Sequence, residues 1–389
     1  MPHYDHSPLP QRDTFEDLPP FPDNVPTAPL LRVSLEKLLQ QDSEEQERCW
    51  KACCDLGFFY LDLRTSTPLG SIEGEALLQD ADRLFEVMKG FYDLDVSKKV
   101  KYDFKDQGSY FGYKGYGEGF IDKQGTRDRN EFYNISKDDV LGLSNSLPSP
   151  AILNSHRDLY KSYSQASHAI CMLITSLVSS RLPLTESARA KGGFQALHRL
   201  DAVSGDQIRF VKAPPQEQSL KGVALGEHTD FGSVTVLFNR LGGLQVRLPD
   251  SITPTPPTST SSPATDIEKR LCENGWTYVR PLPGHCIVNL GDALVKFSSG
   301  ILRSNIHRVV APPGDQGSVT RYSLVYFCRP EDNVVLKSLV EGGEKEEEDV
   351  TAKEWILRRA LGRREKEGWE KSVGTEGESM VRRGGGMRV

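Results

Sequence analysis

The stretch GEHTDFG, residues 226–232, decides the fold, because it sets a histidine and an aspartate two positions apart. Alternate residues of a strand point to the same face, so His228 and Asp230 are expected to project into one cavity. Farther along, NIHRV (305–309) offers His307 from another strand. Two imidazoles and one carboxylate form the facial triad typical of non-haem Fe(II) oxygenases, which leaves positions open for a cosubstrate and O2.

A His-x-Asp pair alone is weak evidence, because such pairs are usually surface neighbours or local hydrogen bonds. The sequence RYS, residues 321–323, strengthens the interpretation. Arg321 and Ser323 share one strand face, where a guanidinium and a hydroxyl can clamp a carboxylate. The distal carboxylate of 2-oxoglutarate requires such a clamp. The alternative for Arg321 is an ordinary ion pair at a strand edge.

The sequence around these motifs predicts helices first and strands later. Helices are expected at 43–56, 76–92 and 154–181, and a capping box (TAKE, 351–354) predicts another to about 361. Many short strands indicate a sandwich, jelly roll or barrel. Strands are expected at 30–33, 58–61, 207–212, 233–238, 243–248, 276–280, 285–290, 293–297, 305–310 and 319–327.

Composition narrows the class of protein. The 389 residues carry a net charge of −6, which disfavours a nucleic-acid binder. Seven cysteines without a Cys-x-x-Cys pair favour a reducing compartment, and we expect the cytoplasm. No apolar stretch approaches the length of a membrane span, so no membrane partner is expected. The oligomeric state stays open.

Beyond the motifs, three segments strongly resemble the Fe(II)/2-oxoglutarate-dependent dioxygenases of the isopenicillin N synthase-like family, of fungal and plant type. They begin GEHTDFGSVTV, WTYVRPLPGHC and RYSLVYF, and CWKACCDLGFFYL extends the likeness toward the N-terminus. The resemblance implies a mainly β fold with helices (α+β): a double-stranded β-helix, or jelly roll, with an N-terminal helical region.

The resemblance also implies roles for individual residues. It implies His228, Asp230 and His307 as iron ligands, and Arg321 and Ser323 as the anchor of 2-oxoglutarate. Many members carry a tyrosine where this chain has Ala213, so Arg209 is expected to help bind the cosubstrate. The implied cofactors are Fe(II), 2-oxoglutarate and O2, with ascorbate as reductant.

The implied reaction is oxidation of a small molecule of secondary metabolism, by hydroxylation, desaturation or ring rearrangement. The sequence does not identify that substrate. Aromatic side chains near the mouth of the barrel are candidate substrate contacts, although each is equally able to be core. The main candidates are Tyr113, Phe132, Phe297 and Phe327, with Tyr110, Phe111 and Tyr116 as further possibilities.

Two alternatives stay open. One is an Fe(II) oxidase of the isopenicillin N synthase or aminocyclopropane-carboxylate oxidase type, which needs no 2-oxoglutarate yet carries the same Arg-x-Ser pair. The other is a non-catalytic jelly roll that binds a metal or ligand.

The expected organisation is one catalytic unit with polar additions. Residues 1–25 form an extended arm, 26–200 the helical region, 201–335 the jelly-roll core, and 336–389 a charged helix and tail. The Ser/Thr/Pro-rich run 251–263 predicts a disordered insertion at 251–270.

Overall fold

The computed structural model describes residues 15, 17–64, 72–216, 222–257, 264–343, 349–365 and 375. Most of the expected arm, the centre of the expected insertion (258–263) and most of the charged tail lie outside these residues. Within the described chain, no helix combines the length and the apolar character needed to cross a membrane.

Helices dominate the first half and strands the second, as the sequence predicts. The helices are α1 (Leu35–Leu39), α2 (Ser43–Asp55), α3 (Gly74–Tyr92), α4 (Val96–Lys99), α5 (Lys137–Leu141), α6 (Ala151–Asn154), α7 (Arg157–Arg181), α8 (Glu186–Ala190), α9 (Asp266–Leu271), α10 (Asp292–Phe297) and α11 (Ala352–Gly362). The strands are β1 (Arg32–Ser34), β2 (Phe58–Asp62), β3 (Gly112–Lys114), β4 (Glu131–Ser136), β5 (Gln207–Ala213), β6 (Val223–His228), β7 (Val234–Asn239), β8 (Leu244–Arg247), β9 (Trp276–Tyr278), β10 (His285–Leu290), β11 (His307–Val310) and β12 (Arg321–Cys328).

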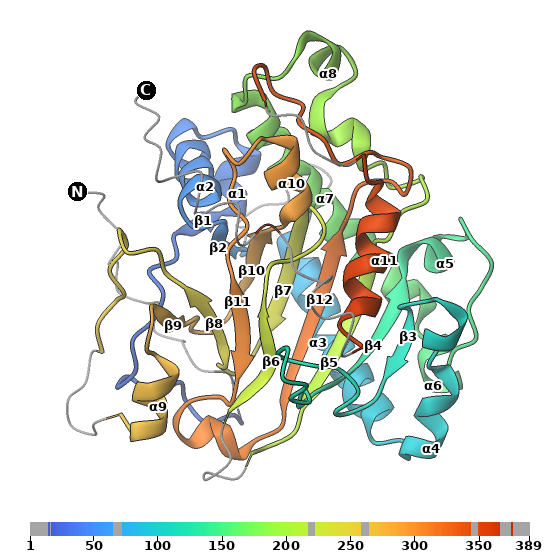
Figure 1. Cartoon of the computed structure of the whole chain (residues 1–389), viewed down its shortest axis with the longest axis vertical. Coiled ribbons are helices and arrows are strands. Elements are labelled where there is room, and N and C mark those ends of the chain that lie inside the picture. Colours follow the sequence, from blue (N-terminus) through green and yellow to red (C-terminus); the bar gives the residue numbers. More distant parts are fainter. Residues whose placement is uncertain are drawn as a thin grey trace.

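The strands form two sheets of unequal size (Figure 1). The larger sheet has the order β1-β2-β10-β7-β12-β5-β4-β3, and the smaller has the order β6-β11-β8-β9. The larger sheet joins strands from the helical region to strands of the core. The sheets and helices together match the predicted jelly-roll class with added helices.

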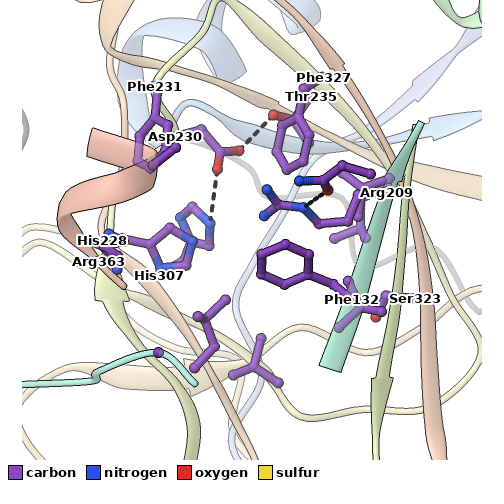
Figure 2. Close-up of a pocket in the computed structure, with 18 of the residues that line it drawn as sticks. Phe132, Arg209, His228, Asp230, Phe231, Thr235, His307, Ser323, Phe327 and Arg363 are labelled. Atoms are coloured by element: carbon purple, nitrogen blue, oxygen red, sulfur yellow. Dashed lines mark hydrogen bonds and ion pairs between the residues drawn. The ribbon is translucent and has the colours of Figure 1, made fainter. Parts of the chain in front are cut away.

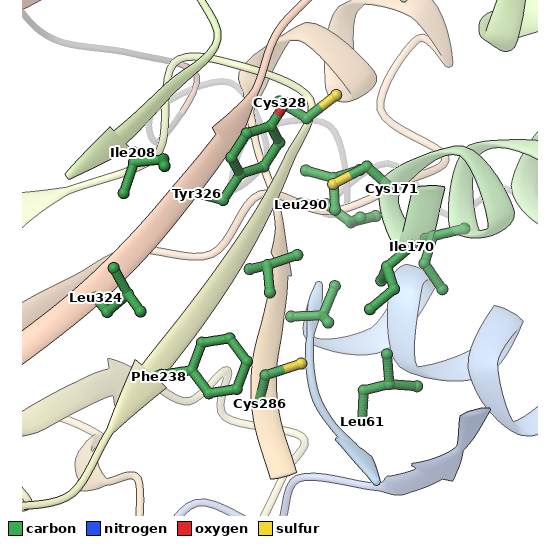
Figure 3. Packing of buried hydrophobic residues seen from close by; sticks show 14 of the residues in the cluster. Leu61, Ile170, Cys171, Ile208, Phe238, Cys286, Leu290, Leu324, Tyr326 and Cys328 are labelled. Carbon is green, nitrogen blue, oxygen red and sulfur yellow. The ribbon is translucent and has the colours of Figure 1, made fainter. Parts of the chain in front are cut away.

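Alternation along the strands gives the larger sheet two different faces. Leu324, Tyr326 and Cys328 of β12 belong to the main hydrophobic core, which α3 and α7 cover on the outer face of the sheet. Figure 3 shows this packing, with Cys171 of α7 close to the strand side chains. The alternate residues of β12, such as Ser323, Val325 and Phe327, face a cavity on the other side.

The inner face of the larger sheet packs on the smaller sheet at one end. Phe58 and Tyr60 of β2 meet Leu244 and Val246 of β8 in a second hydrophobic cluster. These apolar contacts set the spacing of the two sheets at this end. The cavity lies between the same two sheets, farther along their strands.

Two of the predicted segments differ in the structure, and strands β3, β4 and β6 were not among the predicted ranges. Residues 293–297, expected as a strand, lie in helix α10, because a short apolar run does not distinguish a strand from a buried helix. The expected disordered insertion 251–270 ends in helix α9. There Thr265 and Glu268 form a capping box, a local signal that the Ser/Thr/Pro composition obscured.

Candidate active site

The two histidines of the motif are cross-strand neighbours. His228 ends β6 and lies opposite His307, the first residue of β11, in the antiparallel register. Directly opposed residues of paired strands project to the same face. The ring centroids are therefore only 4.1 Å apart, and both imidazoles point into the cavity (Figure 2).

Backbone carbonyls fix the orientation of both rings. Nδ1 of His228 lies 2.8 Å from the carbonyl oxygen of Gly226, and Nδ1 of His307 lies 3.1 Å from that of Asn305. If each Nδ1 carries the donated proton, each Nε2 keeps a free lone pair, as metal-binding histidines require. Burial, and next the neighbouring His307, lower the pKa of His228 well below its usual value, which favours the neutral ligand form.

Asp230 lies just beyond the end of β6, and its carboxylate divides its two oxygens between two tasks. Oδ2 accepts hydrogen bonds of 2.6 Å from Thr235 of β7 and from Asn289 of β10. Oδ1 lies 3.7 Å from Nε2 of His307. The larger sheet thus orients the carboxylate so that one oxygen faces the two imidazoles.

The donor set suits Fe(II). One ligand atom from each of His228, Asp230 and His307 lies within 4.8 Å of the others, and all three come from one face. His168, Asp206 and Cys328 also cluster at this spacing, buried in the core. There Asp206 already accepts hydrogen bonds from the Tyr326 hydroxyl and the Arg329 backbone, so it is the poorer metal site.

The predicted carboxylate clamp lines the same cavity, from strand β12 of the larger sheet. Nη1 of Arg321 donates to the Ser323 hydroxyl at 2.5 Å, Nη2 donates to Asn239 at 3.0 Å, and Nε donates to the Gly242 carbonyl at 2.7 Å. Burial lowers the pKa of Arg321 to about 10, so it remains charged at neutral pH. None of these partners carries negative charge, and such a buried cation favours an anionic ligand.

The cavity holds about 150 Å³, and most of its surface is apolar, although charged and polar side chains also line it. Phe132 and Phe327, both predicted from sequence, line it together with Tyr110. Tyr113 and Phe297 do not reach it. Tyr113 is buried in the core, where its hydroxyl donates a hydrogen bond to the Glu131 carboxylate. Phe297 packs against Phe194.

Several lining residues have no counterpart in the sequence prediction. Thr235 and Leu237 share the inner face of β7 and were available from strand alternation. Arg363 and Arg364 come from the end of α11, which forms another wall of the cavity. No motif signals that a helix far along the chain returns to this site.

Arg209, which the sequence predicts to help bind the cosubstrate, also lines the cavity. It lies apart from the clamp formed by Arg321 and Ser323. It lies opposite Val325 in the β5–β12 register, whereas Arg321 lies opposite Ala213. Its guanidinium is stacked between Phe132 and Phe327, with 4.3 and 5.0 Å to the ring centroids. In Figure 2 it faces the histidines and Asp230.

Comparisons with known proteins agree with this geometry. The model of the 2OG-Fe(II) oxygenase superfamily matches residues 260–330, and the model described as non-haem dioxygenase in morphine synthesis N-terminal matches residues 28–151. A 2-oxoglutarate-dependent dioxygenase of Aspergillus fumigatus is 32% identical over 324 residues, covering 82% of this chain and 80% of the relative. Another, from Dothideomycetidae sp., is 30% identical and covers 85% and 89%.

Solved structures show the same fold. A full-length Neurospora crassa protein in complex with alpha-KG and thymine is 21% identical, with a TM-score of 0.62 over 85% of this chain and 96% of that chain. JOX2 in complex with 2OG, Fe and JA is 22% identical, with a TM-score of 0.60 over 95% and 94%. The chain belongs to the Fe(II)- and 2-oxoglutarate-dependent dioxygenases, and it is an oxidoreductase of that family.

Proposed function

We propose that this dioxygenase oxidises a small molecule of secondary metabolism. In this proposal His228, Asp230 and His307 hold Fe(II), and Arg321 with Ser323 holds the distal carboxylate of 2-oxoglutarate. One observation carries it: the three proposed ligand side chains open into the same cavity as Arg321, a buried arginine whose hydrogen-bond partners in the described chain are all uncharged.

When bound, Fe(II) and 2-oxoglutarate use O2 to oxidise the prime substrate, and 2-oxoglutarate is converted to succinate and CO2. The chain's own residues position and shield these partners. Thr235 and Asn289 hold the Asp230 carboxylate toward the metal position. Asn239 and Gly242 hold the Arg321 guanidinium in one orientation, ready for a bidentate contact.

The apolar cavity supports a small organic substrate. Structures of similar fold contain small molecules: thymine in the Neurospora crassa protein, and JA in JOX2. The match to fungal dioxygenases supports a place in secondary metabolism. Hydroxylation is the default outcome, with desaturation and ring rearrangement as variants.

A panel of small molecules, incubated with the full chain, Fe(II), ascorbate and 2-oxoglutarate, tests this function. Mass spectrometry should detect a product that has gained one oxygen atom or lost two hydrogen atoms, with succinate formed in equal amount. Product without succinate would instead favour an oxidase independent of 2-oxoglutarate. Neither product nor Fe(II)-dependent succinate across the panel would contradict the proposal.

Two further points belong to the proposal. Residues 26–335 act as one catalytic unit, and contacts of α11 with the cavity support extending that unit to residue 365. The chain works in the reducing cytoplasm, which the seven free cysteines support.

A further inference from the structure

Arg209 is held rigidly, yet it leaves its hydrogen-bonding end free. Its Nε donates to Asn134 Oδ1 at 2.7 Å, and two phenylalanine rings enclose the guanidinium from either side. In the described part of the chain, neither terminal nitrogen has a hydrogen-bond partner and no carboxylate lies at ion-pair distance. The two terminal N–H groups therefore form an unused fork that faces the metal ligands (Figure 2).

The charges of the site leave Arg209 uncompensated. The two charges of Fe(II) and that of Arg321 balance Asp230 and the two carboxylates of 2-oxoglutarate. The Asp230 carboxylate lies near enough to favour the charged form of Arg209. A bound metal ion would coordinate this carboxylate, which would then no longer balance the charge of Arg209. Burial, and next the positive charge of Arg329, lower the pKa of Arg209 to about 9, so it is still protonated at neutral pH.

Arg329 adds a second cation to the same wall. Its guanidinium lies 5.3 Å from the Phe327 ring, which Arg209 also contacts. The Arg329 side chain is almost fully buried. Its Nη1 donates to the Gly205 carbonyl, but among the described residues its Nε has no hydrogen-bond partner. Two arginines thus share one aromatic ring, and this wall has a local excess of positive charge.

The anchor for 2-oxoglutarate lies on the same sheet as Arg209 but at a separate position along its strands. The Arg321 guanidinium already donates hydrogen bonds to Ser323, Asn239 and the Gly242 carbonyl. The β5–β12 register places Arg209 beside Val325, four residues farther along β12 than Arg321. The cosubstrate's distal carboxylate therefore has its own site, and the fork of Arg209 remains for a different anion.

We propose that Arg209 binds a carboxylate of the prime substrate, and that the substrate is an apolar or aromatic carboxylic acid. This rests on the proposed function and names its substrate class. The guanidinium fork matches a carboxylate in a bidentate contact, and Phe132 and Phe327 offer flat apolar surfaces beside it. The acid group fixes the substrate, while its apolar body extends toward the metal ligands.

Matched pairs of small aromatic carboxylates and their primary carboxamides test the proposal, among them benzoate with benzamide and 2-naphthoate with 2-naphthamide. Each is titrated calorimetrically into the full chain loaded with Mn(II) and 2-oxoglutarate without oxygen. At least one carboxylate should bind tenfold or more tightly than its amide. Arg209→Gln should remove about tenfold or more of that affinity, with Arg209→Lys in between. Affinity for 2-oxoglutarate should stay unchanged.

Arg240→Gln is the matched control, because Arg240 also stacks on a phenylalanine, Phe85, but lies outside the cavity. It should bind like the wild type. The proposal is overturned if no carboxylate binds better than its amide, or if Arg209→Gln binds the acids normally. It is also overturned if Arg209→Gln loses 2-oxoglutarate instead, which would make Arg209 a cosubstrate ligand. Failure of the proposed function is a separate result: the wild type would then not bind 2-oxoglutarate at all.

Discussion

Arg359 of α11 and Asp292 of α10 form a fully buried ion pair directly behind the proposed metal ligands. The Asp292 carboxylate also accepts a hydrogen bond of 3.0 Å from Thr229, the residue between His228 and Asp230. The Asp292 backbone N–H donates to the Asp230 carbonyl at 2.9 Å. Helix α11 is thereby tied to the segment 228–230, which carries two of the three proposed ligands.

Arg359→Met should destabilise the protein by about 3–5 kcal/mol, because it leaves the Asp292 carboxylate buried without its cation. Arg358→Met, at an exposed position of the same helix, should change the free energy of unfolding by about 0.5 kcal/mol or less. Urea unfolding of the metal-free proteins measures both. Equal stability of the two variants would show that the ion pair does not hold α11 on the loop.

Thr235→Val should weaken metal binding without removing a ligand. The change keeps the side-chain shape but removes a donor to Asp230, and loss of such a partner typically costs about 10–100-fold in metal affinity. Anaerobic titration with Fe(II) measures the affinity. Thr277→Val, a buried threonine outside the cavity, should bind iron like the wild type. Unchanged affinity in Thr235→Val would argue against Asp230 as a ligand.

Arg321→Met should abolish the stabilisation that 2-oxoglutarate gives the protein. With Mn(II) bound, the cosubstrate at a hundred times its Kd should raise the wild-type free energy of unfolding by about 2.7 kcal/mol. The variant lacks the buried cation, so its gain should be near zero at the same concentration. Tyr322→Phe, on the opposite face of β12, serves as control. An equal gain in Arg321→Met would place the cosubstrate elsewhere.

The metal-free protein should lose stability as the pH falls below about 6.5. Burial lowers the pKa of His198, whose Nδ1 and Nε2 lie 2.7 and 2.6 Å from Phe194 O and Ser233 Oγ. The unfolded state therefore takes up this proton first, so the stability is complete above the unfolded pKa and declines below it. For each such histidine, the free energy of unfolding falls by at most about 1.4 kcal/mol for every pH unit below the unfolded pKa.

His198→Gln should make that decline shallower. Unfolding of the wild type and the variant at pH 7.5 and 5.5 gives the comparison. If both lose the same free energy between the two pH values, His198 is not among the groups responsible.

The proposed ligands and the clamp could be named from the sequence because His228 and Asp230, like Arg321 and Ser323, are two positions apart, a spacing that places both members of a pair on one side of an extended chain. His228, His307 and Arg321 occupy ordered backbone, where alternation determines the face. The orientation of the Asp230 carboxylate could not be predicted from the sequence. Its two donors, Thr235 and Asn289, come from strands that pair only in the folded sheet. Their two hydrogen bonds depend on tertiary distances that no local pattern records.

Two aromatic candidates lie outside the cavity, and one buried cation has no sequence signal, for a related reason. Phe297 and Tyr113 sit in short segments whose buried faces cannot be separated into core and cavity by sequence alone. Arg359 looks like one of the exposed cations of an amphipathic helix, and charged residues are seldom buried without a partner. That partner, Asp292, lies in α10, far away in the sequence.

Conversion of 2-oxoglutarate to succinate under air, with and without Fe(II), tests the central claim most directly. The measurement uses the wild type and Asp230→Ala, each confirmed as folded, in the presence of the small-molecule panel. We predict Fe(II)-dependent succinate from the wild type and only background from Asp230→Ala. Full succinate formation by Asp230→Ala, or none by the wild type with any panel member, would contradict the account.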